Sequence, residues 1–227
     1  MGNLCIIPAR GGSKRIPRKN IQSFYGKPIL AYSIELAQKC EIFDEIMVST
    51  DDEEIAEIAI NYGAKVPFLR SEQNANDFAT TIDVLNEVVM EYGKMHLQFE
   101  KLLCIYPTAI LANQNDIKNG FSILEHFDMV LPVTKFSFPP QRSYHINKMN
   151  DGIDFVYPEN ANKRSQDLEP WFHDAGQWYW YNIDKLYKGL INLNKGFVEV
   201  PNIRVQDIDS QEDWEIAELK FKLLHGI

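Results

Sequence analysis

A basic, glycine-rich segment near the N-terminus contains the residue types that bind phosphate groups. It follows the apolar run 4–7, which Pro8 stops, and it holds five cations, two glycines and a serine, among them Arg10, Lys19, Gly11, Gly12 and Ser13. Glycine lets the backbone approach a ligand closely, serine hydroxyls and backbone amides donate to phosphate oxygens, and Arg and Lys balance the charge. The segment therefore predicts a loop that binds a triphosphate.

The spacing of this segment matches neither of the two common nucleotide fingerprints. It has neither the G-x-G-x-x-G pattern nor the G-x-x-x-x-G-K-[ST] pattern. On charge alone, an exposed basic turn explains the segment equally well. Its position after an apolar run is compatible with ligand binding, because open α/β sheets bind ligands at the carboxyl ends of their strands. Both interpretations remain open at this point.

Asp207 and Asp209 form a second candidate site. Residues at i and i+2 of a strand project to the same face, so the two carboxylates can converge on one hard cation, Mg²⁺, while Ile208 points into the core. The alternative is a polar strand end that leads into a helix cap at Ser210. For an isolated D-x-D pair, that alternative is the more common one.

A third polar segment, residues 163–177, contains candidates for sugar recognition. Arg164 can pair with a sugar carboxylate through two hydrogen bonds, and His173 and Gln177 can bind hydroxyl or acetamido groups. Taken alone, these residues are explained more simply as a surface loop.

The composition excludes several classes of protein. The 227 residues carry a formal net charge of −9, whereas a nucleic-acid surface needs clustered Lys and Arg, so the basic cluster at 10–19 indicates a small anionic ligand. No stretch approaches the roughly 20 apolar residues of a membrane helix, and no signal segment is evident. The three cysteines are widely spaced and predict buried thiols. We expect a soluble, cytoplasmic protein without nucleic-acid or membrane partners.

Apolar runs and helical periodicities alternate along the chain. Strands are expected at 4–7, 45–49, 66–69, 101–106, 129–134, 177–181, 197–200 and 205–208, and helices at 28–40, 51–62, 82–92, 114–126, near 184 and from 210 onward. This alternation predicts a three-layer αβα, Rossmann-like fold with a mainly parallel sheet. The aromatic run 178–181 is interpreted as a strand with one face in the core rather than as a sugar-stacking platform.

The periodicity fades between Lys135 and Pro170, where Pro, Asn, Asp and isolated aromatics are frequent. A loop of this length inside a compact domain usually has a function or covers a partner. We therefore expect a single domain over residues 1–227, with 135–170 as a dimerisation arm or a substrate lid.

The N-terminal segment, continued by Gly26-Lys27-Pro28-Ile29, resembles the signature of the CMP-sugar synthetases, also called acylneuraminate cytidylyltransferases. The resemblance implies that the αβα fold is a Rossmann-like nucleotidyltransferase fold. Further matching segments follow in the family's order and spacing: Val48-Ser49-Thr50-Asp51-Asp52, Phe68-Leu69-Arg70, Ala79-Thr80-Thr81 and Tyr106-Pro107-Thr108. The resemblance implies that Arg70 lies near the cytosine or ribose, and that Thr80 or Thr81, which can also cap a helix, lies near the ribose or base. The implied nucleotide-binding residues are Ala9, Arg10, Gly11, Gly12, Ser13, Lys19, Asn20, Arg70, Thr80 and Thr81.

The same family holds its catalytic metal with an aspartate pair before its last helix, which favours Asp207 and Asp209 as a Mg²⁺ site. Residues 106–109 and 163–177 resemble the pseudaminic acid branch, whereas the neuraminic acid branch typically carries glutamine in place of Tyr106. The implied sugar-binding residues are Tyr106, Thr108, Arg164, His173 and Gln177. The family usually forms homodimers in which the arm of one subunit completes its neighbour's site.

The expected activity is Mg²⁺-dependent transfer of CMP from CTP to an acidic α-keto sugar of nine carbons. Pseudaminic acid is the expected sugar, and N-acetylneuraminic or legionaminic acid is the alternative. The expected catalytic residues are Arg10, Lys19, Asp207 and Asp209.

Two further alternatives remain at this stage. One is a glycosyltransferase that binds metal through Asp51 and Asp52, and the other is a non-catalytic cytidine nucleotide sensor. Paired metal carboxylates argue against a sensor, because nucleotide binding alone does not need them.

Overall fold

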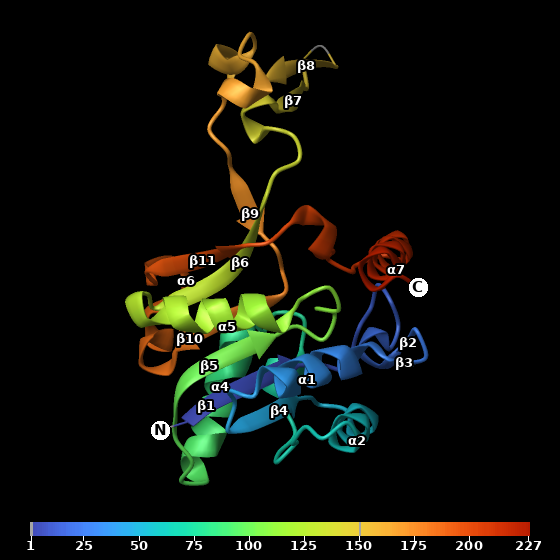
Figure 1. Cartoon of the computed structure of the whole chain (residues 1–227), viewed down its shortest axis with the longest axis vertical. Helices are drawn as coiled ribbons and strands as arrows, with labels where there is room; N and C mark the ends of the chain where they lie inside the picture. The colour runs from blue at the N-terminus through green and yellow to red at the C-terminus, as the bar shows by residue number, and fades with distance from the viewer. Residues whose placement is uncertain (1, 150) are drawn as a thin grey trace.

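A mixed seven-stranded sheet organises the molecule, and the computed structural model describes residues 2–149 and 151–227 of the chain (Figure 1). The strand order is β11-β6-β10-β5-β1-β4, and β9 pairs with β6. Five strands of this path run in parallel, while β10 is antiparallel to both of its neighbours. The strands are β1 (Gly2–Pro8), β4 (Glu45–Ser49), β5 (Phe99–Ile105), β6 (Met129–Lys135), β9 (Phe172–Asp174), β10 (Trp178–Asn182) and β11 (Lys195–Glu199).

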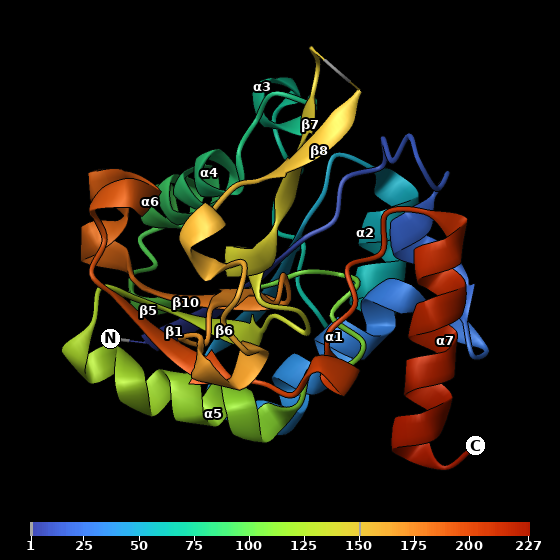
Figure 2. The same ribbon diagram turned by 90° about the horizontal axis from the view of Figure 1, so that it is seen from above.

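Helices cover both faces of this sheet, which confirms the predicted three-layer αβα architecture. Alternate residues of β1 belong to different clusters: Cys5 and Ile7 pack with α1, α2 and α5, whereas Leu4 and Ile6 pack with α4. Figure 2 shows α5 on one face and α4 with α6 on the other. The helices are α1 (Ile29–Cys40), α2 (Glu53–Asn61), α3 (Glu72–Ala75), α4 (Thr81–Lys94), α5 (Gln114–Ile123), α6 (Gly189–Asn192) and α7 (Gln211–His225).

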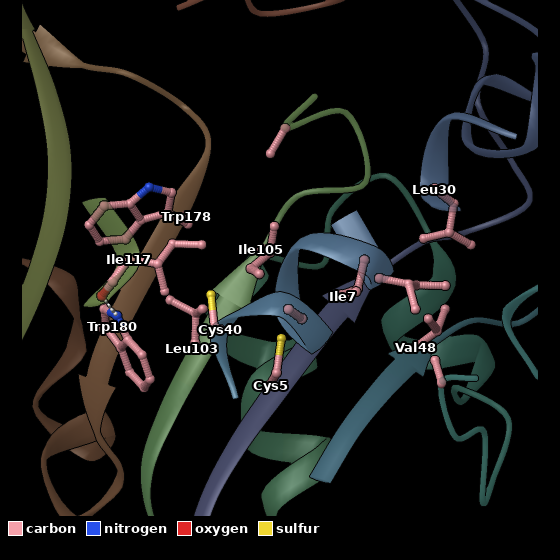
Figure 3. Packing of buried hydrophobic residues seen from close by; sticks show 14 of the residues in the cluster. Cys5, Ile7, Leu30, Cys40, Val48, Leu103, Ile105, Ile117, Trp178 and Trp180 are labelled. Atoms are coloured by element: carbon pink, nitrogen blue, oxygen red, sulfur yellow. Dashed lines mark hydrogen bonds between the residues drawn. The ribbon is translucent and has the colours of Figure 1, made fainter. Parts of the chain in front are cut away.

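The aromatic strand β10 is buried on both faces, not on one as predicted. Trp178 and Trp180 lie in the cluster beneath α1 and α5, while Tyr179 and Tyr181 lie in the opposite cluster. Figure 3 shows the two indoles beside the residues of the first cluster, with the Trp180 Nε1 donating to the backbone oxygen of Ile117 at 3.0 Å. The run is therefore a core strand and not a sugar platform.

Two of the predicted strands are wrong. Residues 66–69 form no strand, because Pro67 cannot donate to a ladder, and only Lys65 makes an isolated bridge with Met47. Residues 205–208 form none either, although Val205 and Ile208 are buried. Their backbone oxygens accept hydrogen bonds from lysine side chains, Val205 from Lys220 at 2.6 Å and Ile208 from Lys19, instead of from a neighbouring strand.

The last helix, α7, anchors the segment that precedes it. Ser210 caps α7 as predicted, in a reciprocal capping box with Asp213. Trp214 and Phe221 of α7 pack in a third cluster that also contains Ile208 and Ile29, the first residue of α1. Residues 207–209 are thereby held next to the short elements that follow the glycine-rich loop: η1 (Lys19–Ile21), β2 (Ser23–Phe24) and β3 (Lys27–Pro28).

Residues 136–171 form an arm that projects from the body of the molecule (Figure 1). Its two ends are joined where β6 pairs with β9, and its outer part is a hairpin of β7 (Tyr144–Asn147) and β8 (Gly152–Phe155). The described residues of the arm also form three single 3₁₀ turns: η3 (Pro140–Arg142), η4 (Pro158–Asn160) and η5 (Ser165–Asp167). The arm coincides with the segment in which the periodicity of the sequence fades.

All three cysteines are buried free thiols, as the sequence predicted. Burial raises the pKa of Cys5 and Cys104, and it raises the pKa of Cys40 to about 11. Within 2–149 and 151–227, no helix has the length and apolar composition needed to cross a membrane.

Candidate active site

A cleft of about 570 Å³ opens at the carboxyl ends of β1 and β5, beside the first turn of α4 and the segment before α7. This is the edge at which α/β sheets bind ligands. Its lining residues come from five separate stretches of the chain: Pro8, Arg10, Ser13, Lys14, Arg15, Lys19, Asn20, Arg70, Asn74, Asn76, Asp77, Ala79, Thr80, Thr81, Val84, Tyr106, Pro107, Thr108, Asp207 and Asp209.

The glycine-rich loop is held in place by the carboxylates that follow β4. The Gly11 amide donates to Asp51 Oδ1 at 2.9 Å, and the Asn20 side chain donates to the Arg10 backbone oxygen at 2.9 Å. A Cβ on Gly11 would lie 2.7 Å from Asp52 Oδ2, whereas a Cβ on Gly12 would meet nothing within 4 Å. The packing of the protein therefore requires a glycine at 11 and would accommodate a larger residue at 12.

Alanine substitutions at these two glycines are expected to differ. Gly11→Ala should lower the free energy of unfolding by about 1–3 kcal/mol, because the new methyl group overpacks against Asp52, which caps α2. Gly12→Ala should unfold like the parent in urea, because its methyl group would meet nothing within 4 Å. We expect it to bind CTP more weakly, because a methyl group would hinder the close approach of a phosphate to the loop backbone that the sequence predicts. Normal CTP affinity of Gly12→Ala would show that no phosphate approaches Gly12 closely.

Each cation between residues 10 and 19 is paired with a carboxylate from another part of the chain. Arg10 lies 2.8 Å from Asp77, which also accepts from Lys14. Asp209 is paired with Arg15 at 2.8 Å and with Lys19 at 3.5 Å. Outside the cleft lining, Arg18 pairs with Asp52 and Glu54. The cations of the basic loop can thus bind anions, and in this structure they are paired with carboxylates of the protein itself.

Asp207 and Asp209 both face the cleft, separated by the fully buried Ile208. Burial raises the pKa of Asp207, the neighbouring charge of Asp209 raises it further, and Lys19 opposes the shift. Such crowding of negative charge is relieved by a cation. Two carboxylates that leave room for water and phosphate oxygens fit the ligand preference of Mg²⁺. Among the described residues no group of three or more His, Cys, Asp or Glu side chains could hold a metal.

Arg70 is buried at the inner wall of the cleft, with 8% of its surface exposed. Its Nε donates to Ser49 Oγ at 3.0 Å and its Nη2 to the Ser49 backbone oxygen, while burial lowers the pKa of the guanidinium. The Oγ1 of Thr81 and the hydroxyl of Tyr106 lie 3.1 Å apart. These polar groups form a rigid surface suited to a base or ribose.

Thr80 is the N-cap of α4, which is the structural role that the sequence allowed for it. Its hydroxyl accepts from the Asp83 amide at 3.2 Å and donates to the Asp83 carboxylate at 2.6 Å. Both hydrogen-bonding directions of this hydroxyl are thus used within the helix cap.

Three of the predicted sugar-binding residues do not line the cleft of their own chain. Arg164 lies on the arm and pairs with Asp167, and His173 stacks on Phe136 at the base of the arm. Gln177 is buried and donates to the Arg204 backbone oxygen. The arm carries Arg164 away from the sheet edge (Figure 1), whereas His173 belongs to β9 and Gln177 directly precedes β10.

The cleft also contains residues that sequence reasoning left out of the site. Lys14 and Arg15 belong to the basic cluster at 10–19, and the 74–79 segment carries Asn74, Asn76, Asp77 and Ala79. A signal for that segment exists: an acidic residue that follows two asparagines, just before the cap of a helix. The local sequence pattern does not show that Asp77 pairs with a loop more than 60 residues away.

The cytidylyltransferase family model matches residues 4–180, which include most of the residues that line the cleft. The chain belongs to the cytidylyltransferase family. It is therefore a CTP-dependent nucleotidyltransferase. It is 41% identical to the pseudaminic acid cytidylyltransferase of Campylobacter jejuni subsp. jejuni serotype O:23/36 (strain 81-176), over 99% of this chain and 98% of that protein. It is 31% identical to the CMP-N,N'-diacetyllegionaminic acid synthase of Legionella pneumophila (strain Philadelphia 1), over 97% and 96%.

Solved structures agree with the cytidylyltransferase in fold. A CMP:2-keto-3-deoxy-manno-octonic acid synthetase complexed with CTP superposes with a TM-score of 0.73 at 18% identity, covering 100% of both chains. A 4-diphosphocytidyl-2C-methyl-D-erythritol synthase from Anaerococcus prevotii gives a TM-score of 0.64 at 15% identity, over 97% of this chain and 98% of that one. At these identities the likeness establishes the fold alone.

Proposed function

We propose that this cytidylyltransferase transfers CMP from CTP to the anomeric hydroxyl of pseudaminic acid and releases pyrophosphate. The observation that carries the proposal is the meeting of the basic glycine-rich loop and the Asp207–Asp209 pair across one cleft. The sugar is inferred from the full-length relative, 41% identical, that bears this activity in its name.

The main obstacle to this reaction is charge, because an anionic sugar must approach a polyanionic nucleotide. In the proposal, Arg10 and Lys19 hold the triphosphate together with the Ser13 hydroxyl and the loop amides. Arg70, Thr81 and their neighbours position the cytidine. The sugar occupies the side of the cleft near Tyr106 and Thr108 and directs its hydroxyl at the α-phosphorus.

Asp207 and Asp209 would hold Mg²⁺, the proposed cofactor, through their carboxylate oxygens. A divalent cation there neutralises charge on the phosphates and orients them. Binding it requires that Asp209 exchange at least part of its pairing with Arg15 and Lys19. Those two cations then become available to the phosphates of CTP.

The structure disfavours a glycosyltransferase that binds metal after β4. Asp51 accepts from the Gly11 amide, and Asp52 caps α2 while it pairs with Arg18. Both carboxylates are engaged in holding the glycine-rich loop, and neither lines the cleft.

A panel of acidic sugars tests the proposal. Purified enzyme with CTP and Mg²⁺ is expected to release pyrophosphate with pseudaminic acid and at least about 100-fold more slowly with other acids, because a site that hydrogen-bonds one stereochemistry leaves buried polar groups unpaired with another. The comparison acids are legionaminic, N-acetylneuraminic and 3-deoxy-manno-octulosonic acid. If the enzyme turns over one of these acids and not pseudaminic acid, the proposed reaction stands and the proposed sugar is wrong. If it turns over none of the four acids, both the reaction and the sugar are rejected.

The arm supports a further part of the proposal, a homodimer. In the hairpin, Tyr144 pairs with Phe155 and Ile146 with Ile153, so one face is apolar, and Ile146 and Ile153 are 73% and 63% exposed. The opposite face carries His145 and other polar residues. A two-stranded hairpin is marginal in water by itself, so an exposed apolar face of this kind indicates a covering partner. In the proposed dimer, the arm of one subunit reaches its neighbour's cleft.

A further inference from the structure

The carboxylate of Asp77 bridges two cations of the glycine-rich loop inside the cleft. Arg10 Nη1 lies 2.8 Å from Asp77 Oδ1, and Lys14 Nζ donates to Asp77 Oδ2. Arg10 Nη1 also donates to the backbone oxygen of Asn76 at 3.0 Å. An anion shared between an arginine and a lysine is the arrangement that a phosphate group adopts in such a loop.

The backbone around Asp77 is built to hold this carboxylate in place. The Asn76 Oδ1 accepts from the amides of Phe78 and Ala79 at 2.7 and 3.1 Å, and the Asn76 Nδ2 donates to the Gln73 backbone oxygen at 2.7 Å. Thr80 follows immediately as the cap of α4. The turn therefore fixes the backbone of Asp77. The side chain of Asp77 remains 40% exposed and can move away from Arg10 and Lys14.

Asp77 differs from the other carboxylates that pair with the loop. Asp52 caps α2 and pairs with Arg18, which does not line the cleft. Asp209 belongs to the proposed metal pair. Asp77 lines the cleft and its pairs with Arg10 and Lys14 lower its pKa, so it is ionised throughout the neutral range.

We propose that Asp77 competes with the phosphates of CTP for Arg10 and Lys14, and so sets the affinity of the cleft for triphosphate and pyrophosphate. The inference rests on the proposed position of the triphosphate on the glycine-rich loop. A carboxylate and a phosphate repel each other, so CTP must displace Asp77 before both cations can bind it. As pyrophosphate leaves, Asp77 returns to the same cations. Asp77 thereby favours release of a product that the loop would otherwise retain.

Calorimetric titration of the sugar-free enzyme at constant Mg²⁺ tests this competition. Asp77→Asn is expected to bind CTP and pyrophosphate about three- to tenfold more tightly than the parent, since two solvent-exposed ion pairs no longer need to be broken. Cytidine, which has no phosphate, should bind both proteins equally. Glu72→Gln is the matched control, because it removes the same charge from the neighbouring helix α3.

The outcomes separate competition from general attraction of anions. If Asp77→Asn and Glu72→Gln raise the affinity for CTP equally, the change in net charge explains the effect and the proposal is overturned. Weaker CTP binding by Asp77→Asn would also overturn it, because Asp77 would then be positioning Arg10 for the nucleotide. In a Lys14→Met background the gain from Asp77→Asn should shrink, since one of the two contested cations is absent.

A failure of the underlying site would look different. If CTP does not bind to the glycine-rich loop, Arg10→Ala will leave CTP affinity unchanged, and the proposed function fails with it. If Arg10→Ala weakens CTP binding and Asp77→Asn does not strengthen it, only the role of Asp77 is rejected.

Discussion

Replacing Asp209 with asparagine is expected to lower turnover by at least about 100-fold, the scale of effect seen when a ligand or a preorganised charge is removed from a reaction centre. The amide retains the shape of the carboxylate and loses the charge that would hold Mg²⁺ beside Asp207. The change costs little stability, because the ion pairs of Asp209 with Arg15 and Lys19 are partly exposed and contribute about 1 kcal/mol or less each.

The measurement is pyrophosphate release at saturating CTP and sugar, with a Mg²⁺ titration for each variant. Asp207→Asn should behave similarly, whereas Glu212→Gln, an acidic residue in the first turn of α7 that does not line the cleft, should retain parental rates. A chelator should abolish the parent's activity, and added Mg²⁺ should restore it. Near-normal turnover of Asp209→Asn with an unchanged Mg²⁺ requirement would remove Asp209 from the metal site.

The parts of this site that could be predicted from sequence are those whose functional residues lie close together along the chain. The glycine-rich loop and the Asp207-Ile208-Asp209 segment each place charged groups and turn residues within a few positions. The alternation that put Ile208 in the core also holds in the structure, although the segment is not a strand. Val205 belongs to the cluster beneath α1 and Ile208 to the one beneath α7, so the segment crosses between two cores instead of joining the sheet.

Other features could not be predicted because they depend on pairing across long separations. Strand direction is one: the run 178–181 has the same pattern whether it is parallel or antiparallel, and only the return of the chain through the arm makes β10 antiparallel to β5. Asp77 is another, since its partners lie more than 60 residues away. The role of Gly11 is a third, because the group that it accommodates, Asp52, belongs to the cap of a different helix.

Placing a charge on the apolar face of the arm is expected to convert the proposed dimer into a monomer. Ile146→Asp combined with Ile153→Asp would bury two carboxylates at the interface, and the cost of desolvating them should weaken association by at least about 100-fold. The mass measured by light scattering should fall by half. His145→Asp, on the polar face of the same hairpin, should leave the mass unchanged. A parent protein that is already monomeric would reject the homodimer.

Complementation between two inactive variants tests whether the arm reaches the neighbouring cleft. Arg164 lies on the arm and Asp209 in the cleft, so in the proposed dimer each active site would take Arg164 from one subunit and Asp209 from the other. Arg164→Ala and Asp209→Asn should each be impaired alone. After mixing and exchange of subunits, half of the dimers would be mixed and hold one intact site, which restores up to about a quarter of parental activity. If the subunits exchange and activity does not recover, any contribution of Arg164 to catalysis would have to be made to the cleft of its own chain. Such a contribution would require the arm to fold back, which its joining strands β6 and β9 oppose because they pair directly at its base.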